Sequence, residues 1–590
     1  SGGNLTIAGV GNGGLGGAIP QGASVTLGSV TESGGNRSIT VAMASTGAVS
    51  LTATSSGWSG GTILKSGMLI AGANAGLNLG TGGVTLDGGT WRTLMGTNGA
   101  LSLSDAISVT ANGGTLEGFN SNGNVPTVIF NGTISGSGPL TLRYGGTGTN
   151  TMGVALAPNS VSGFNGTITL ATSNGRGGVQ FSGNSLAGLG NGSVTVGAET
   201  VFGVNTIGTL TGNIAKFSTN ADSILALDNL TPNAVDLSAA GLNRDLRVGN
   251  RASLTYSGTL TPFGNTYNIT PAGGGTLTLN GTNALTGNRN VDVRAGAVAT
   301  GAYGAATGTL LVTGSNDFSG NLAVGGTLNN SLIGAGGTTG TTLEIGAGGN
   351  LTSTGSVWVE RGATLALTGN AASLGRISAA NATVTVRGGG TLRIGNTTAA
   401  SNNGVTDRLE PTAGITLGGA GAGGGTLSMA YGTNGTVSQT LSKLTVAAGS
   451  STINTVNTSN GTMNMIFTGT DGAGYTRTVG GVVNLNSLGN FSISLTNAPT
   501  AANSTLNGTA APILVGAVLN GTDFVAAATG NLAAPTYTTQ TAVGSWGADQ
   551  NITNGGGAYA GNVTSNLSIN SLRLTGTTSG SGNILSLIHI

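Results

Sequence analysis

Short runs in which apolar and polar residues alternate make up most of the chain. In each run Val, Leu or Ile occupies every second position, and Thr or another small polar residue lies between them. Examples are residues 166–170, 193–196, 275–279, 382–387 and 390–394. This period of two, with many β-branched residues, predicts half-buried β-strands. The clusters of Gly, Asn and Ser between the runs predict turns, because these residues adopt turn conformations readily.

The alternation also predicts which side chains point inward. The aliphatic residues at alternate positions should form the core, and the threonines between them should face outward. The expected inward residues are Ile168, Leu170, Val194, Val196, Leu277, Leu279, Val384, Val386, Leu392 and Ile394, and the expected outward ones are Thr169, Thr195, Thr278 and Thr385. No stretch shows convincing helical periodicity with caps, and residues 220–230 come nearest to it.

Internal repeats indicate how the strands are arranged. Residues 276–288 align without a gap on residues 309–321, at an offset of 33. A second motif, at residues 58–70, is followed by a related one at 79–91, and its core recurs at 189–196. Short strands recurring in this way predict an all-β, single-stranded parallel β-helix, a solenoid for which we assume about 22 residues per coil. A string of β-sandwiches is the alternative, although sandwich cores usually contain more aromatic residues.

The composition excludes several other classes of protein. The chain has 590 residues, of which 113 are Gly, 6% are charged and none is Cys, and its net charge is +1. The missing Cys excludes a disulfide or zinc-thiolate scaffold. The absence of a three-residue Gly period excludes collagen. We also expect no nucleic-acid binding, since no basic stripe is present, and no transmembrane segment, since no apolar run reaches 18 residues.

The few charged residues offer little chemistry. The densest cluster is Arg244, Asp245, Leu246 and Arg247, with Arg251 nearby. Alternate arginines on one strand face would grip a sugar carboxylate, whereas the simpler interpretation is a solvated outer face.

Two further groups bring charged neighbours together, Glu360 with Arg361 and Asp407 with Arg408 and Glu410. Adjacent strand residues point to opposite faces, so neither group predicts a paired-carboxylate site.

No catalytic, cofactor-binding or metal-binding residue is predicted. The only His is His589, so a nucleophile has no base and a metal has few ligands. The Gly-x-Gly patterns lack the Lys-Ser/Thr of a phosphate loop and are expected to be turns. The four tryptophans are candidate sugar-stacking platforms, although Trp91 and Trp358 lie in strand patterns that favour the core or its flank; the others are Trp58 and Trp546. We therefore expect a protein without cofactors that is not an enzyme.

Several of the repeated motifs resemble a known family. Ser59-Gly60-Gly61-Thr62 with Gly67-Met68-Leu69, then Leu79-Gly80-Thr81-Gly82 with Val84-Thr85-Leu86-Asp87-Gly88-Gly89, is similar to the autotransporter-associated β-strand repeat of bacterial surface proteins. Residues 131–142 resemble the opening of that repeat. The resemblance implies a right-handed parallel β-helix that forms the secreted passenger of an autotransporter. In complete members of the family a signal peptide precedes the passenger and an outer-membrane β-barrel often follows it.

Both ends of the sequence suggest a fragment of a solenoid open at both ends. The chain begins with Ser1-Gly2-Gly3 inside the repeat pattern, and residues 585–590 have the sequence encoded by a common transposase adapter. We predict a β-helical repeat region at 1–508, a less regular segment at 509–560, the start of further β-strand repeat at 561–584, and an adapter-derived artefact at 585–590. If this is right, His589 is not native.

The expected function is that of a secreted or surface-exposed scaffold or adhesin, passenger-like and non-catalytic, at the bacterial cell surface or outside the cell. Its expected partners are neutral glycans, other copies of itself, and an outer-membrane β-barrel translocator in a missing C-terminal part. The alternative is a β-helix that binds or degrades polysaccharides through a site outside this fragment.

Overall fold

A computed structural model describes the strands and many of the turns of the chain. The described residues are 4–9, 24–28, 30–44, 47–52, 57–71, 79–95, 100–120, 127–144, 153–157, 160–161, 163–172, 178–182, 186, 189, 191–197, 200–219, 223–238, 246–251, 253–271, 275–294, 308–325, 340–352, 355–370, 372–380, 382–396, 406–419, 421, 423–430, 436–456, 462–469, 474–486, 490–499, 506–507, 512–526, 529–542, 545–547, 550–553, 569 and 571–573. They form two compact units, the first comprising Ser1–Leu285, Val293–Leu310 and Thr339–Thr341, and the second Thr286–Asp292, Leu311–Thr338 and Thr342–Ile590.

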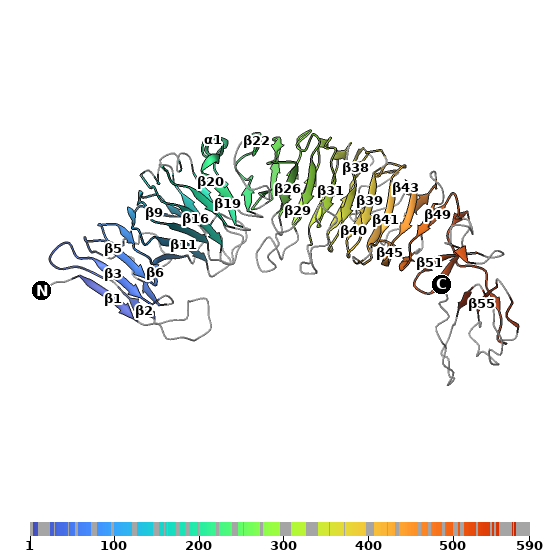
Figure 1. Ribbon diagram of the computed structural model, residues 1–590, viewed down its shortest axis with the longest axis horizontal. Helices are drawn as coiled ribbons and strands as arrows, with labels where there is room; N and C mark the ends of the chain where they lie inside the picture. Colours follow the sequence, from blue (N-terminus) through green and yellow to red (C-terminus); the bar gives the residue numbers. More distant parts are fainter. Residues whose placement is uncertain are drawn as a thin grey trace. The chain divides into compact units, whose positions relative to one another are not determined.

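The first unit is a three-sided parallel β-helix (Figure 1). One side contains β1 (Leu5–Gly9), β3 (Ile39–Met43), β5 (Thr62–Ser66), β7 (Val84–Leu86), β10 (Ile107–Val109) and β13 (Ile134–Gly136). The second contains β2 (Ser24–Leu27), β4 (Ala48–Leu51), β6 (Met68–Ala71), β8 (Thr90–Met95), β11 (Gly114–Asn120), β14 (Leu140–Tyr144), β16 (Ile168–Thr172), β18 (Val194–Val196) and β20 (Phe217–Thr219). The third contains β9 (Ala100–Leu103), β12 (Thr127–Phe130), β15 (Val154–Leu156), β17 (Val179–Phe181), β19 (Val201–Val204), β21 (Ile224–Ala226), β23 (Arg247–Gly249) and β26 (Thr266–Thr270). A coil such as β10, β11 and β12 therefore visits the three sides in turn before the next coil begins.

The remaining elements of the first unit are two further pairs of parallel strands and two short helices. The strand pairs are β22 (Val235–Asp236) with β25 (Leu260–Thr261), and β24 (Leu254–Tyr256) with β27 (Thr276–Leu279). The helices are α1 (Ile207–Thr211) and the 3-10 turn η1 (Ile214–Lys216). Strands β28 (Asn290–Val293) and β29 (Thr309–Val312) each contain residues assigned to both units.

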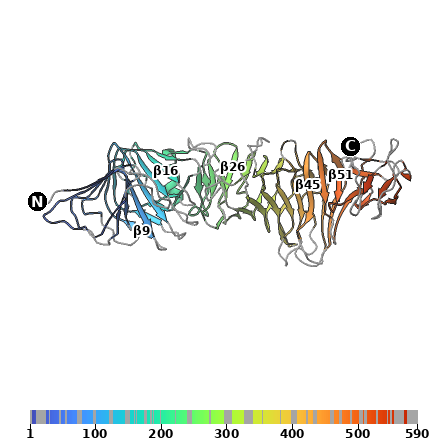
Figure 2. The ribbon, with the colours of Figure 1, turned by 90° about the horizontal axis from the view of Figure 1, so that it is seen from below.

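The second unit repeats the three-sided parallel arrangement; Figure 2 gives a second view of its strands around β45. One side contains β31 (Leu322–Val324), β34 (Val357–Val359), β39 (Thr383–Val386), β41 (Gly414–Leu417), β44 (Lys443–Val446) and β47 (Tyr475–Arg477). Another contains β32 (Thr342–Ile345), β35 (Thr364–Leu367), β40 (Thr391–Ile394), β42 (Thr426–Met429), β45 (Gly449–Thr455), β48 (Gly481–Leu485) and β51 (Ile513–Leu519). The third is formed by β30 (Ser315–Asn316), β33 (Asn350–Leu351) and β38 (Arg376–Ile377), and then by β43 (Thr436–Leu441), β46 (Thr462–Phe467) and β49 (Phe491–Leu495).

Antiparallel pairs join the second unit after β49. Strand β51 pairs antiparallel with β50 (Leu506–Asn507) and β52 (Asp523–Ala526), and β53 (Gly530–Asn531) pairs antiparallel with β49. An earlier antiparallel hairpin joins β36 (Gly369–Asn370) to β37 (Ser373–Leu374), and β54 (Thr538–Thr539), β55 (Asn551–Thr553) and β56 (Ser571–Arg573) form a small parallel sheet. The domain boundaries expected at 508, 560 and 584 stay predictions. Residues 585–590, and all of 561–584 except 569 and 571–573, lie outside the described residues.

The predicted parallel β-helix is confirmed, and so is the inward register. All ten aliphatic residues expected in the core are buried, each with at most 1% of its surface exposed. The intervening Thr169, Thr195, Thr278 and Thr385 are half-buried on the opposite strand face. The apolar residues thus stack from coil to coil, and burial of this stripe supplies the main stabilisation of the fold.

Residues 220–230, the nearest approach to a helical pattern in the sequence, contain strand β21, because Ile224 and Leu225 stack between neighbouring coils. The helix that does form is α1, whose first turn is capped by the Thr206 hydroxyl accepting from the Thr209 amide at 3.2 Å. Coil lengths vary around and above the assumed 22 residues: in-register partners are 22 residues apart at Thr62 and Val84, 25 at Arg92 and Glu117, and 31 at Thr445 and Thr476.

The repeated motifs are successive coils. The Thr309 amide donates to the Gly275 carbonyl at 3.1 Å, so the two copies found at an offset of 33 start on neighbouring coils. In the other motif, Gly61 and Gly83 both adopt positive φ, at 77° and 76°. A Cβ atom on Gly61 would lie 2.6 Å from the Gly83 carbonyl oxygen, so only Gly fits this stacked turn.

Candidate functional site

A row of threonine hydroxyls follows the outer face of one side of the second unit. Thr385, Thr416, Thr445 and Thr476 lie in register on β39, β41, β44 and β47, and we call these four residues the threonine ladder. Each is half-buried, and each follows a buried core residue, so each side chain points outward. The hydroxyls of Thr445 and Thr476 are 3.0 Å apart and hydrogen-bonded. The ladder therefore presents regularly spaced donors and acceptors, one per coil.

An open depression of about 220 Å³ lies beside the threonine ladder. Its lining includes Thr383, Gly414, Thr416, Ser442, Lys443 and Thr445. Gly414 stands in register between Thr383 and Lys443, so the face lacks one side chain at this point. A Cβ atom at position 414 would meet its nearest neighbours, Ser442 Oγ and Lys443 Cγ, at 3.6 and 3.7 Å, which is ordinary contact. We call this feature the Gly414 depression.

Trp358 stands at one end of the same face. It lies in register with Ala323 on one side and with Thr385 of the threonine ladder on the other. Its neighbours in β34, Val357 and Val359, are fully buried, whereas Trp358 is half-buried. The indole therefore projects from the outer face, which places Trp358 on the flank of the solenoid.

The other tryptophans occupy different environments. Trp91 is fully buried and stacks edge-on against Phe130, with ring centroids 5.6 Å apart. Trp58 is also buried, and its indole nitrogen donates to the Gly61 carbonyl at 3.1 Å. Trp546 is half-buried and lies outside the strands. Their core positions exclude Trp91 and Trp58 as stacking platforms. Alternation along each strand is the signal that could have separated Trp358, which lies between the core residues Val357 and Val359, from Trp91.

Outward hydroxyl and amide rows recur on other sides of both units. In the first unit one row contains Thr90, Thr115, Thr141, Thr169, Thr195 and Ser218. In the second unit another contains Thr342, Thr364, Thr391, Thr426 and Thr452. On the third side Ser492 donates to the Asn464 amide oxygen at 2.7 Å, and Asn464 donates to Ser438 at 3.4 Å. The sequence alternation predicted these outward polar residues, but not which of them stack.

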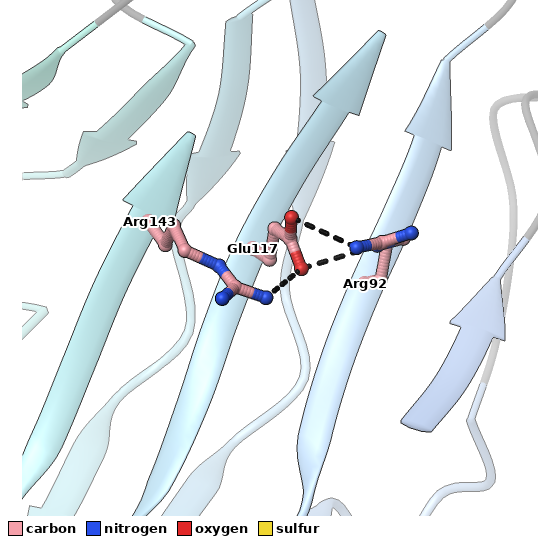
Figure 3. A network of polar contacts seen from close by, with 3 residues as sticks. All are labelled: Arg92, Glu117 and Arg143. Atoms are coloured by element: carbon pink, nitrogen blue, oxygen red, sulfur yellow. Dashed lines mark hydrogen bonds and ion pairs between the residues drawn. The ribbon is translucent and has the colours of Figure 1, made fainter. Parts of the chain in front are cut away.

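A buried charge network on the first unit is shown in Figure 3. Arg92 Nε and Nη2 each donate to a carboxylate oxygen of Glu117 at 3.1 Å, and Arg143 Nη2 donates to Glu117 at 2.6 Å. The Glu117 side chain is 1% exposed, and those of Arg92 and Arg143 are 10% and 32% exposed. The Arg92 guanidinium also lies over the Phe119 ring, 4.4 Å from its centroid. This carboxylate is fully engaged in joining three coils and has no free oxygen for acid–base work.

The charge cluster predicted around Arg247 does not form a sugar-carboxylate grip. Arg247 is buried and donates to the Ile269 carbonyl at 2.7 Å and to the Thr270 hydroxyl. It is therefore not on a solvated outer face either, because its backbone-bonded guanidinium lies inside the fold. Arg251 pairs with Asp228 at 3.3 Å, while Arg244 and Asp245 lie outside the described residues.

The other two charged groups also hold coils together. Glu360 is 1% exposed and accepts from Arg387 Nε at 2.7 Å. Arg408 is buried and donates to backbone carbonyls, among them that of Gly369 at 2.8 Å, and its burial lowers its pKa to about 10. Asp407 accepts the Thr440 amide at 2.7 Å. Glu360 and Asp407 are thus each engaged by a residue of a neighbouring coil.

The part of the chain that is described contains no candidate metal site. Among those residues no group of three or more His, Cys, Asp or Glu side chains comes together. His589 is outside them. Within the same residues no helix is long and apolar enough to cross a membrane.

Comparison with protein families, with curated proteins and with solved structures finds no match to this chain.

Proposed function

We propose that the protein is a secreted or surface-exposed, non-catalytic scaffold whose outer faces act as an adhesin. The observation that carries the proposal is the set of outward hydroxyl and amide rows on a parallel β-helix of low charge. Hydroxyl and amide groups exchange hydrogen bonds with neutral glycans, whose surfaces carry the same kinds of group. The rows extend over many coils, so many weak contacts add up along one ligand or surface.

Association with other copies of the chain is part of the same proposal. Charged residues make up 6% of the sequence and the net charge is +1, so electrostatic repulsion between two copies is weak. Several of the charges that are described are also buried in ion pairs, including Glu117 and Glu360. Outer faces dominated by Thr, Ser and Asn are then free to meet one another.

The location at a bacterial surface, and an outer-membrane β-barrel as translocator, rest on the resemblance to the autotransporter-associated β-strand repeat. The stacked Gly61 and Gly83 turns and the neighbouring strands β5 and β7 give that repeat a physical role, since it builds successive coils. This supports the proposal because stacked repeats of this kind build extended binding surfaces.

The lack of catalysis is supported by how the acids are used. Glu117 and Glu360 are held by arginines, and Asp407 by a backbone amide. A glycosidase needs two carboxylates facing one another across a substrate, and these acids do not provide that arrangement.

The test is adhesion of the purified chain to immobilised polymers. We expect retention on surfaces coated with neutral polysaccharides or with the chain itself, changing little between low and high salt because few charges are available to screen. Absence of retention on every neutral polysaccharide and on the chain itself would refute the proposal. Release of reducing ends from a polysaccharide would instead favour the alternative of a polysaccharide-degrading β-helix.

A further inference from the structure

Trp358, the threonine ladder and the Gly414 depression occupy one continuous stretch of sheet. The in-register order along the outer face is Trp358, Thr385, Thr416 and Thr445. Neighbouring strands are about 4.8 Å apart, so Trp358 lies about 10 Å from Thr416 at the depression. This distance equals two strand spacings, so a ligand that reaches both features must be longer than a single sugar ring.

The chemistry of this stretch combines an aromatic ring with hydroxyl groups. An indole that projects from a sheet offers an apolar face to the C–H groups of a sugar ring. The threonine hydroxyls beside it both donate and accept hydrogen bonds, as sugar hydroxyls do. Lys443 and Ser442 add donors at the wall of the Gly414 depression. An aromatic ring beside hydroxyl groups matches the mixed apolar and polar surface of a sugar, so the face favours a carbohydrate.

The charges along the face indicate a neutral carbohydrate. The residues that line the Gly414 depression include one cation, Lys443, and no acid. Glu360, two residues beyond Trp358 on the same strand face, is buried and bonded to Arg387, which cancels its charge. An acidic polysaccharide is normally met by several arginines or lysines, and the lining has a single lysine.

We propose that Trp358 and the Gly414 depression form one binding site for a neutral hexose oligosaccharide. One sugar ring stacks on the Trp358 indole, the chain of sugars crosses Thr385, and a later ring enters the depression between Thr383 and Lys443. The sugar chain thus runs across the strands, from coil to coil. This inference rests on the proposed adhesive function and assigns it a ligand class and a site.

Two substitutions test the two ends of the site, each with a matched control. Trp358→Ala removes the platform, whereas Trp358→Phe keeps an aromatic ring. Gly414→Leu fills the depression, whereas Gly414→Ala adds one methyl group that meets its neighbours only at ordinary contact distances. No positive φ is found at Gly414, so both substitutions suit the backbone. Circular dichroism and thermal melting identify any variant that does not fold.

The measurement is titration of the full chain with cellohexaose, maltohexaose and mannohexaose, followed by calorimetry and by tryptophan fluorescence. Hexagalacturonate serves as the acidic probe. We expect one neutral hexasaccharide to bind and to change the fluorescence. Trp358→Ala and Gly414→Leu should each weaken binding by roughly tenfold or more, since each removes a central contact. Trp358→Phe and Gly414→Ala should each stay within about threefold of the wild-type affinity.

The outcomes separate this inference from the proposed function. Equal affinity in the wild type and in folded Trp358→Ala and Gly414→Leu would overturn the site, while adhesion to polysaccharide surfaces would still stand. Binding of hexagalacturonate in preference to every neutral probe would overturn the neutral ligand class. If no hexasaccharide binds while immobilised polymer retains the chain, the site is refuted and the adhesive function is not.

Discussion

Replacing Glu117 by Ala should destabilise the coils around it far more than its single charge suggests. The carboxylate is 1% exposed and joins Arg92, on the coil before, to Arg143, on the coil after. Its removal leaves the 10%-exposed Arg92 guanidinium without its bidentate partner in a largely desolvated position. Breaking a buried ion pair in this way costs about 3–5 kcal/mol. Arg143 is 32% exposed and regains water, so we expect the lower end, about 3 kcal/mol.

Hydrogen exchange of the backbone amides is the suitable assay, because a solenoid opens locally rather than as a single unit. A loss of about 3 kcal/mol corresponds to roughly 150-fold faster exchange of the protected amides in β8, β11 and β14. The control is Asp236→Asn, which removes an exposed acid of the same unit and should change exchange by less than about 0.5 kcal/mol.

A second variant separates the contribution of the ion pairs to stability from that of side-chain packing. The triple change Arg92→Met, Glu117→Leu and Arg143→Met removes all three charges together, and apolar replacement of a buried charge network is often close to neutral. We therefore expect exchange in β11 near the wild-type rate in the triple variant. If Glu117→Ala exchanges as slowly as the wild type, or if the triple variant is as unstable as Glu117→Ala, the reasoning from buried charge is wrong.

The remaining predictions concern the core, a titrating tyrosine and catalysis. Val386→Asp places an unpaired charge at a fully buried position and should lower the free energy of unfolding by at least about 3 kcal/mol, whereas Thr385→Asp on the outer face should be tolerated. Urea unfolding of the two variants tests this, and equal unfolding midpoints would contradict the strand register. Burial and hydrogen bonding to Asp523 raise the pKa of Tyr537 to about 12. Stability from this group is therefore fully present below pH 10 and is lost as the pH rises toward 12, and Tyr537→Phe should flatten this part of the stability–pH curve; an unchanged curve would show that Tyr537 contributes nothing. Purified chain should release no reducing ends or unsaturated products from pectin, alginate, chitin or starch, and turnover abolished by mutating any one acid would show that an active site exists.

The sequence by itself determined that the chain forms half-buried strands, and which residues of those strands point inward. Alternation placed Ile168 and Leu170 inside and Thr169 outside, because strand side chains point to opposite faces in turn. The strand patterns around Trp91 and Trp358 left both as core or flank residues, and the structure places Trp91 inside and Trp358 on the outer face.

The tertiary structure alone decided which residues meet across coils. Arg92, Glu117 and Arg143 are 25 and 26 residues apart along the chain, so their network depends on the length of each intervening coil. Coil lengths vary, and turns absorb the differences, so no fixed spacing in the sequence marks such partners. A change of one residue in register would move Glu117 away from both arginines and turn it to the other face.

The surface formed by Trp358, the threonine ladder and the Gly414 depression also depends on how the coils stack. Trp358, Thr385 and Thr416 belong to three different coils, and none of their local sequences differs much from other strands of the chain. The Gly414 depression exists only because one missing side chain is stacked between Thr383 and Lys443. Local propensity determines a strand residue by residue, whereas a surface across strands is determined by the register in which the coils stack.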